Sequence, residues 1–69
     1  MKEFVLIFDV PRESVAVAVK TWRDLGKIGA KKLQHSVWKS EKLQDLIDIA
    51  TFIKKSGGNA SILEEKLIF

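Results

Sequence analysis

Asp9 is the residue whose type and position could do chemistry. An unbroken apolar run, Phe4 to Phe8, leads directly into this carboxylate and then to Pro11. Mg²⁺ and Mn²⁺ prefer carboxylate oxygens as ligands, but one carboxylate per chain cannot hold the ion tightly. Two copies of Asp9 brought together could share a divalent cation, which would position water for phosphodiester hydrolysis. Asp9 is therefore our candidate metal ligand and catalytic residue. The alternative is an Asp that accepts backbone N–H groups at the start of a helix.

Other residues capable of chemistry are sparse. The chain has one histidine and no cysteine, which excludes disulfides and thiolate zinc sites. His35 lies mid-strand, where a lone histidine is more often a packed or edge residue than a catalyst. No Ser/His/Asp set is recognisable, and the "SGGN" at 56–59 lacks the lysine and hydroxyl of a phosphate-binding loop.

The charge of the chain fits either a phosphate partner or an ordinary solvated surface. Twelve basic and nine acidic residues give a net charge of +3 and a pI near 9.4. Such an excess attracts nucleic acid without sequence specificity, although lysine-rich solvated surface is the alternative interpretation. From their clustering we expect Lys31, Lys32, Lys39 and Lys42 to contact phosphates.

The length of 69 residues predicts a single domain over 1–69. A core of this size rarely supplies more than about 3–5 kcal/mol of net stability, so we expect self-association. The apolar runs are too short to span a membrane, and a signal-peptide pattern is not recognisable at the N-terminus. We therefore expect a cytoplasmic protein with no membrane contact.

The elements that must position these residues alternate between strand and helix. Residues 3–9 read as a central strand. Pro11 suits the first turn of a helix, which we expect to start there with Glu13 in that turn and to end at Gly26 and Gly29. Its predicted buried stripe is Val15, Ala18, Val19, Trp22 and Leu25.

The second half repeats the alternation. Residues 29–40 have a strand pattern, as one long strand or two short ones bent near His35 and Ser36. Ser40 is a plausible cap for a second helix, with Glu41 in its first turn. That helix is predicted to end at 56–59, and 60–69 read as a last strand or a short hairpin. Its predicted buried stripe is Leu43, Leu46, Ile47, Ala50 and Ile53.

This order predicts an α+β fold, the ferredoxin-like βαββαβ sandwich with one antiparallel sheet and both helices on one face. Either Phe4, Leu6 and Phe8 or Val5 and Ile7 would then face water. We expect a symmetric homodimer packed through the sheet. Trp38 either contributes to that surface or is an ordinary core tryptophan.

The chain resembles the CRISPR-associated Cas-two family, whose members carry an apolar strand ending in Asp, then a helix, a glycine and a Gln-x-Ser-Val-aromatic strand. The matching residues here are Asp9, Gly29, Gln34, Ser36, Val37 and Trp38. The resemblance implies a ferredoxin-like homodimer that handles nucleic acid during spacer acquisition in antiviral defence. It implies either a metal-dependent endonuclease acting through Asp9 or the scaffold that accompanies a CRISPR integrase subunit. Family members also begin the helix with arginines, represented here by Arg12, a further candidate for nucleic-acid binding.

A second resemblance is to the N-terminal module of chromate-resistance protein B and, more remotely, to the C-terminal module of the phenylacetate repressors. It rests on Val10, Pro11, Trp22, Arg23, Leu25, Gly29 and Ala30. It implies the same fold in a non-enzymatic dimerisation or regulatory module. We favour the Cas-two resemblance, because Asp9 and the Gln-x-Ser-Val-aromatic run occur together in one small chain.

Overall fold

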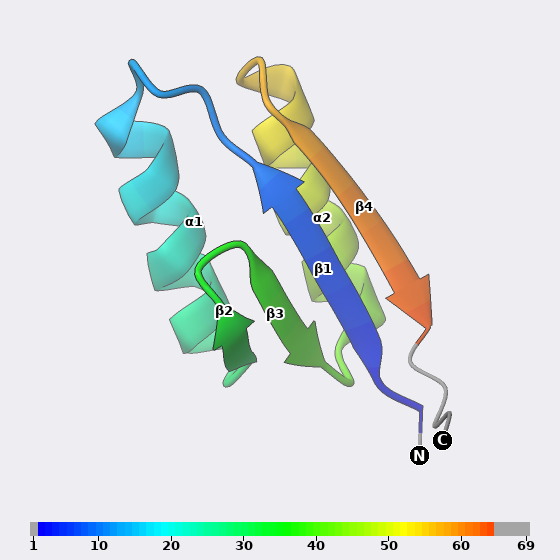
Figure 1. Cartoon of the computed structure of the whole chain (residues 1–69). Coiled ribbons are helices and arrows are strands. Elements are labelled where there is room, and N and C mark those ends of the chain that lie inside the picture. Colours follow the sequence, from blue (N-terminus) through cyan, green and yellow to red (C-terminus); the bar gives the residue numbers. More distant parts are fainter. Residues whose placement is uncertain (1, 65–69) are drawn as a thin grey trace.

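The computed structural model describes residues 2–64 and has one four-stranded antiparallel sheet with both helices on the same face (Figure 1). The elements are β1 (Phe4–Asp9), α1 (Val15–Lys27), β2 (Lys31–Gln34), β3 (Val37–Ser40), α2 (Leu43–Lys55) and β4 (Asn59–Glu64). The strand order is β2-β3-β1-β4. This arrangement confirms the predicted α+β class and is compatible with the ferredoxin-like fold. Of the predicted last strand, 65–69 lie outside the described residues.

The two faces of β1 have different surroundings. Leu6 and Phe8 are buried against the helices, with Phe4 packed at the edge of the same core. Because side chains alternate along a strand, Val5 and Ile7 lie on the opposite, open face. The structure thus decides between the two sets named above: Val5 and Ile7 form the set on the open face, where Val5 is half-buried and Ile7 is exposed.

Trp38 is a core residue. It lies directly opposite Leu6 in the sheet and is buried. Its indole Nε1 donates a hydrogen bond to the carbonyl oxygen of His35 at 3.0 Å. Of the two roles considered for this side chain, the structure shows the core role, so Trp38 does not contribute to the open face.

Residues 29–40 contain two short strands. β2 and β3 are joined by a turn at His35 and Ser36, with an irregular register between Lys32 and Gln34. The carbonyl oxygen of Ser36 accepts a hydrogen bond from the Phe8 N–H at 3.0 Å, which fastens the turn to the central strand.

The predicted start of α1 is wrong by four residues. The Ser14 N–H donates to the carbonyl oxygen of Pro11 at 3.1 Å, so residues 11–14 form a turn of their own and the helix begins at Val15. Glu13 consequently lies before the helix and not in its first turn. Residues 11–14, which we expected in the first turn of the helix because proline is common there, thus lie in a turn before it.

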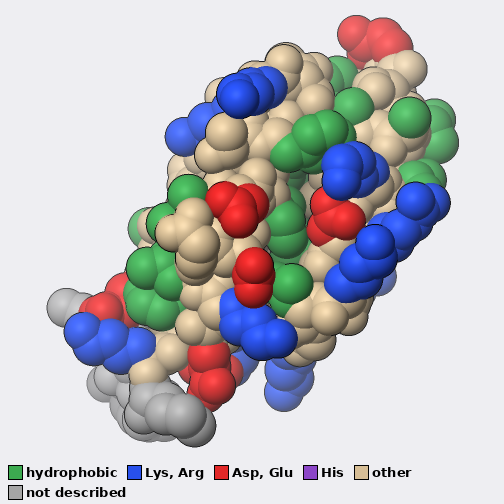
Figure 2. Space-filling model, turned by 180° about the vertical axis from the view of Figure 1, so that it is seen from behind, with side chains coloured by type: hydrophobic (Ala, Val, Ile, Leu, Met, Phe, Trp, Pro, Cys, Tyr) green, Lys and Arg blue, Asp and Glu red, His purple; other side chains and the backbone are tan. Residues whose placement is uncertain are grey.

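The predicted buried stripe of α1 is also wrong, except at Leu25 and the half-buried Ala18. The helix instead buries Thr21, whose hydroxyl donates to the Val17 carbonyl oxygen at 2.8 Å. The hydroxyl is the only polar group of this side chain, and because the hydrogen bond satisfies it, Thr21 can be buried. Val15, Val19 and Trp22 remain exposed, Val15 by 71%. Seen from the helix side, apolar and basic side chains lie next to each other on the flank formed by α1 (Figure 2).

α2 is close to its prediction. Its buried residues are Leu46, Ile49, Ala50 and Ile53. Ile49 replaces the exposed Leu43 and Ile47 of the predicted stripe. Ser40 does not cap the helix directly: its Oγ accepts the Lys42 N–H at 3.0 Å, and α2 starts one residue later. Glu41 therefore precedes the helix, and Asp45 is the acid in the first turn.

Both helices end at glycine as expected. Gly29 has a φ of 71°, and the Ala30 N–H donates to the Leu25 carbonyl oxygen at 3.0 Å. Gly57 occupies the same position after α2, with a φ of 94°. Such left-handed positions favour glycine and satisfy the last carbonyl groups of a helix. Gly26, by contrast, lies inside α1. Within residues 2–64, neither helix is long and apolar enough to cross a membrane.

Candidate nucleic-acid interface

Asp9 lies at the end of β1 on the open face of the sheet. It is exposed, and Asn59 of β4 lies directly opposite it in the register. Side chains directly opposite in an antiparallel pair have Cβ atoms about 4.5–5.5 Å apart. With the residues that the structure describes, the Asp9 carboxylate forms no hydrogen bond or ion pair. Asp9 therefore does not cap α1, which begins only at Val15.

The neighbouring side chain of Asn59 suits the metal hypothesis. Its amide oxygen and the Asp9 carboxylate are the hard oxygen donors that Mg²⁺ prefers. Among residues 2–64, no group of three or more His, Cys, Asp or Glu could hold a metal ion. One chain therefore supplies half of such a site at most. Sequence reasoning missed Asn59, because only the pairing register of β1 with β4 brings it next to Asp9.

Three of the candidate lysines come together at the opposite end of β1. Lys31 and Lys39 are cross-strand partners, and Lys42 follows β3 on the way to α2. All three line a depression of about 200 Å³, together with Glu3, Ile28, Gly29, Ser40 and Glu41. Lys39 pairs with Glu3 at 3.5 Å, and its side chain is only 19% exposed. Lys31 and Lys42 are exposed. We call the depression lined by these three lysines the lysine depression.

The other two candidates lie elsewhere. Lys32 is opposite Trp38 and so occupies the face of the sheet that carries the helices. Arg12 lies in the turn between β1 and α1 and is exposed. The structure therefore gathers three of the five expected phosphate-binding residues in one place and leaves Lys32 and Arg12 apart.

The lysine depression is separated from Asp9 by most of the sheet. In the register of β1 with β3, Lys39 lies directly opposite Val5, which is four residues before Asp9 along β1. At about 3.3 Å per residue, the two positions are roughly 13 Å apart. Within one chain, the carboxylate and the lysines cannot act on the same phosphate group.

An apolar strip occupies the space between these two ends. Val5 lies opposite Leu63, and Ile7 lies opposite Val37, all on the open face. Ile7 is 41% and Leu63 is 54% exposed. We call Val5, Ile7, Val37 and Leu63 the apolar strip. It is the uncovered apolar surface of the sheet on which the expectation of a homodimer rests.

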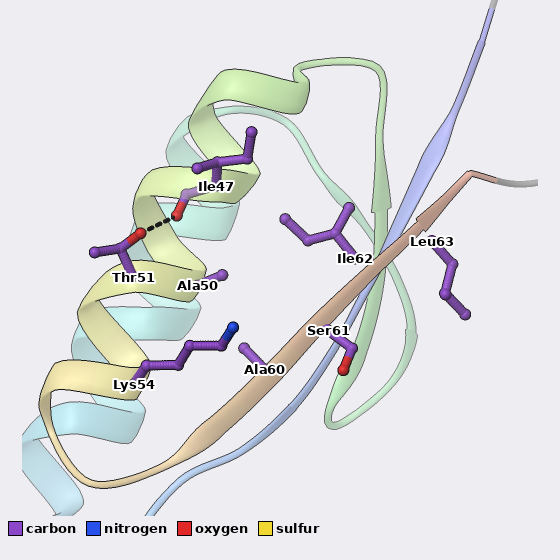
Figure 3. Close-up of a pocket in the computed structure, with 8 residues that line it drawn as sticks. All are labelled: Ile47, Ala50, Thr51, Lys54, Ala60, Ser61, Ile62 and Leu63. Atoms are coloured by element: carbon purple, nitrogen blue, oxygen red, sulfur yellow. Dashed lines mark hydrogen bonds between the residues drawn. The ribbon is translucent and has the colours of Figure 1, made fainter.

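A cleft of about 510 Å³ lies between α2 and the outer edge of β4 (Figure 3). Lys54 extends from α2 toward Ala60, and the Thr51 hydroxyl donates to the Ile47 carbonyl oxygen at 2.8 Å. No carboxylate or imidazole of the described residues lines this cleft. A lysine beside an edge strand opposes pairing of that strand with another one, and this is the role that we assign to Lys54.

Comparison with known proteins adds no assignment: the sequence matches no family model, and a search of the curated proteins finds no match.

Proposed function

We propose that this chain is a small homodimeric protein that binds nucleic acid, as its resemblance to the Cas-two family implies. The observation that carries the proposal is the lysine depression, in which Lys31, Lys39 and Lys42 converge from β2, β3 and the segment before α2. Lysine ammonium groups bind the phosphate backbone without reading the base sequence. The expected role is that of a cytoplasmic scaffold for nucleic acid beside a CRISPR integrase subunit.

Dimerisation supports this role by doubling the number of phosphate-binding sites. A single depression contains three lysines but also two glutamates, so its attraction for one phosphate is modest. If two copies pack through their apolar strips, one assembly carries two depressions. Joining two weak sites in one particle raises the overall affinity by increasing the effective concentration at the second site.

The test is the salt dependence of binding. Lys31→Gln with Lys42→Gln removes two exposed charges from the depression and leaves the Lys39–Glu3 pair intact. For each phosphate that the protein no longer neutralises, the slope of log K against log salt falls by about 0.7 for single strands and 0.9 for duplexes. The matched control, Lys54→Gln with Lys55→Gln, makes the same charge change at the end of α2.

We expect the first pair to weaken binding and flatten the salt slope, and the control to change both much less. Equal effects of the two pairs would mean that the protein attracts nucleic acid only through its net charge. No binding at low salt by the wild-type protein would refute the proposal and favour the non-enzymatic regulatory module that the second resemblance implies.

A second candidate function is metal-dependent cleavage of nucleic acid. The observation that favours it is the exposed pair of oxygen-bearing side chains, Asp9 and Asn59, at the end of the open face. Two copies of this pair would supply enough oxygen ligands for Mg²⁺ or Mn²⁺. When bound, such an ion lowers the pKa of a coordinated water and stabilises charge on the phosphate. The role of this chain is to hold the ion and orient it.

Cleavage is tested on labelled single- and double-stranded RNA and DNA with Mg²⁺ or Mn²⁺. Asp9→Asn should abolish cleavage and Asn59→Ala should weaken it, because each removes an oxygen ligand or its charge. The control is Asp48→Asn, which removes an exposed carboxylate from α2. Cleavage that persists unchanged in Asp9→Asn would remove Asp9 from the reaction.

A further inference from the structure

Two tryptophans, the histidine and one of the phosphate candidates meet in a pocket outside the sites described above. Trp22 of α1, Lys32 of β2, His35 of the turn and Trp38 of β3 line a pocket of about 260 Å³, which we call the Trp22 pocket. The ring centroids of Trp22 and His35 are 6.4 Å apart, and the rings are tilted by 51°. Trp22 is 43% exposed. Three of the four side chains that line the pocket are aromatic.

The pocket is held in shape before any ligand arrives. The Trp38 N–H is already engaged by the His35 carbonyl oxygen, so Trp38 offers a ligand only its apolar ring atoms. The hydrogen bond from the Phe8 N–H to the Ser36 carbonyl oxygen fixes the turn that carries His35. A site with fixed walls loses little conformational entropy when it binds a rigid, flat molecule.

The charge of the pocket selects the sign of its ligand. Lys32 is exposed, and no carboxylate of the described residues lines the pocket. A cationic guest of an aromatic cage would therefore be repelled, whereas an anionic group beside a ring would be attracted. The volume is below the range typical of drug-sized ligands, which suits one ring system at a time. A nucleobase next to a phosphate combines both properties.

We propose that the Trp22 pocket binds an unpaired nucleobase by stacking on Trp22, with the adjoining phosphate on Lys32. When the base belongs to a bound strand, this inference rests on the proposed function. Lys31 and Lys32 are neighbours on the edge strand β2 but face opposite sides of the sheet. A single strand that crosses this edge can place one phosphate at the lysine depression and the next base in the pocket. A free nucleotide has the same chemistry.

The experiment compares three probes: an oligodeoxyadenylate, an abasic oligonucleotide with the same number of phosphates, and AMP. Affinity is measured by fluorescence anisotropy for the strands and by quenching of tryptophan emission for all three. The variants are Trp22→Ala and Lys32→Gln. Val15→Ala is the matched control, because it truncates another exposed apolar side chain of α1 that does not line the pocket. Circular dichroism verifies that each variant is folded.

We expect the adenylate strand to bind at least about fivefold tighter than the abasic strand, because that factor corresponds to the lower end of the range for stacking a base on an aromatic side chain. Trp22→Ala should abolish this difference, Lys32→Gln should weaken AMP binding, and Val15→Ala should change neither. Equal binding of the two strands to the wild-type protein, without quenching, would overturn the base pocket and leave backbone binding intact. Quenching by AMP that depends on Trp22, without binding of either strand, would support the pocket and refute the proposed function.

Discussion

Gly58→Ala should be the most damaging of the small substitutions open to this chain. Gly58 follows α2, and its N–H donates to the Ile53 carbonyl oxygen at 2.9 Å. A Cβ at this position would collide with the backbone carbonyl oxygen of Asp9 and lie 2.9 Å from the Cγ2 atom of Ile53. The first obstacle is backbone of the central strand, and Ile53 is fully buried in the core. Neither group can turn aside, so β1 and the chain entering β4 must separate.

The cost can be estimated from this geometry. Forcing an extra methyl group into a packed site costs about 1–3 kcal/mol. A single core of this size supplies only about 3–5 kcal/mol in total. A domain of 60–100 residues loses roughly 4–8 °C of Tm for each kcal/mol. Gly58→Ala should therefore remove a large share of the free energy of unfolding and also disturb the pairing of Asp9 with Asn59.

The measurement is urea unfolding followed by circular dichroism at one fixed protein concentration, because the proposed dimerisation would make stability depend on concentration. Gly26→Ala is the matched control. A Cβ at Gly26 meets nothing within 4 Å, and the residue lies inside α1 without a positive φ. Alanine in a helix is more favourable than glycine by about 0.5–1 kcal/mol. The same substitution should thus stabilise the protein at one position and destabilise it at the other. Gly58→Ala with wild-type stability would refute the close approach of Gly58 to β1.

Two further predictions concern the open face. Ile7→Glu places a charge in the middle of the apolar strip, so it should convert a dimer to monomers in sedimentation equilibrium. The control Ile47→Glu, at a similarly exposed position on α2, should not change the mass. An unchanged mass for Ile7→Glu would place any dimer interface elsewhere. Asp9→Asn should change the free energy of unfolding by less than about 0.5 kcal/mol in urea titrations, because its exposed carboxylate forms no hydrogen bond or ion pair with the described residues. A larger decrease would show that Asp9 has a structural role.

The elements were predictable where a local physical rule has one solution. The apolar run of β1 and the change to alternating residues after Gly29 predicted the sheet, and Gly29 and Gly57 predicted the helix ends. The start of α1 was misplaced because Pro11 opens a separate turn before the helix instead of its first helical turn. In the sequence, nothing reveals that the Ser14 N–H closes that turn on the Pro11 carbonyl.

The rotation of α1 was not predictable for a different reason. The stretch VAVAV at 15–19 is apolar at every position, so it fits several helical faces equally well. The observed rotation buries Thr21, whose hydroxyl donates to the Val17 carbonyl oxygen, and leaves Trp22 exposed. The same rotation brings Trp22 to His35 and Lys32. The Trp22 pocket therefore depends on the rotation of α1 about its axis, which the hydrophobic pattern of the sequence does not predict.

Of the two candidate functions, only metal-dependent cleavage requires a particular arrangement of the proposed dimer. The open face has a carboxylate at one end of β1, lysines at the other and the apolar strip between them. A twofold axis parallel to β1 superimposes like ends and brings the two copies of Asp9 together, as metal-dependent cleavage needs. An axis perpendicular to β1 that passes through the middle of the strand would instead place Asp9 near the partner's Lys39. Coulomb energy favours the perpendicular arrangement without a divalent cation and opposes the parallel one. The proposed cleavage would therefore need the metal for assembly as well as for chemistry, whereas the proposed backbone binding by the lysines would need no metal in either arrangement.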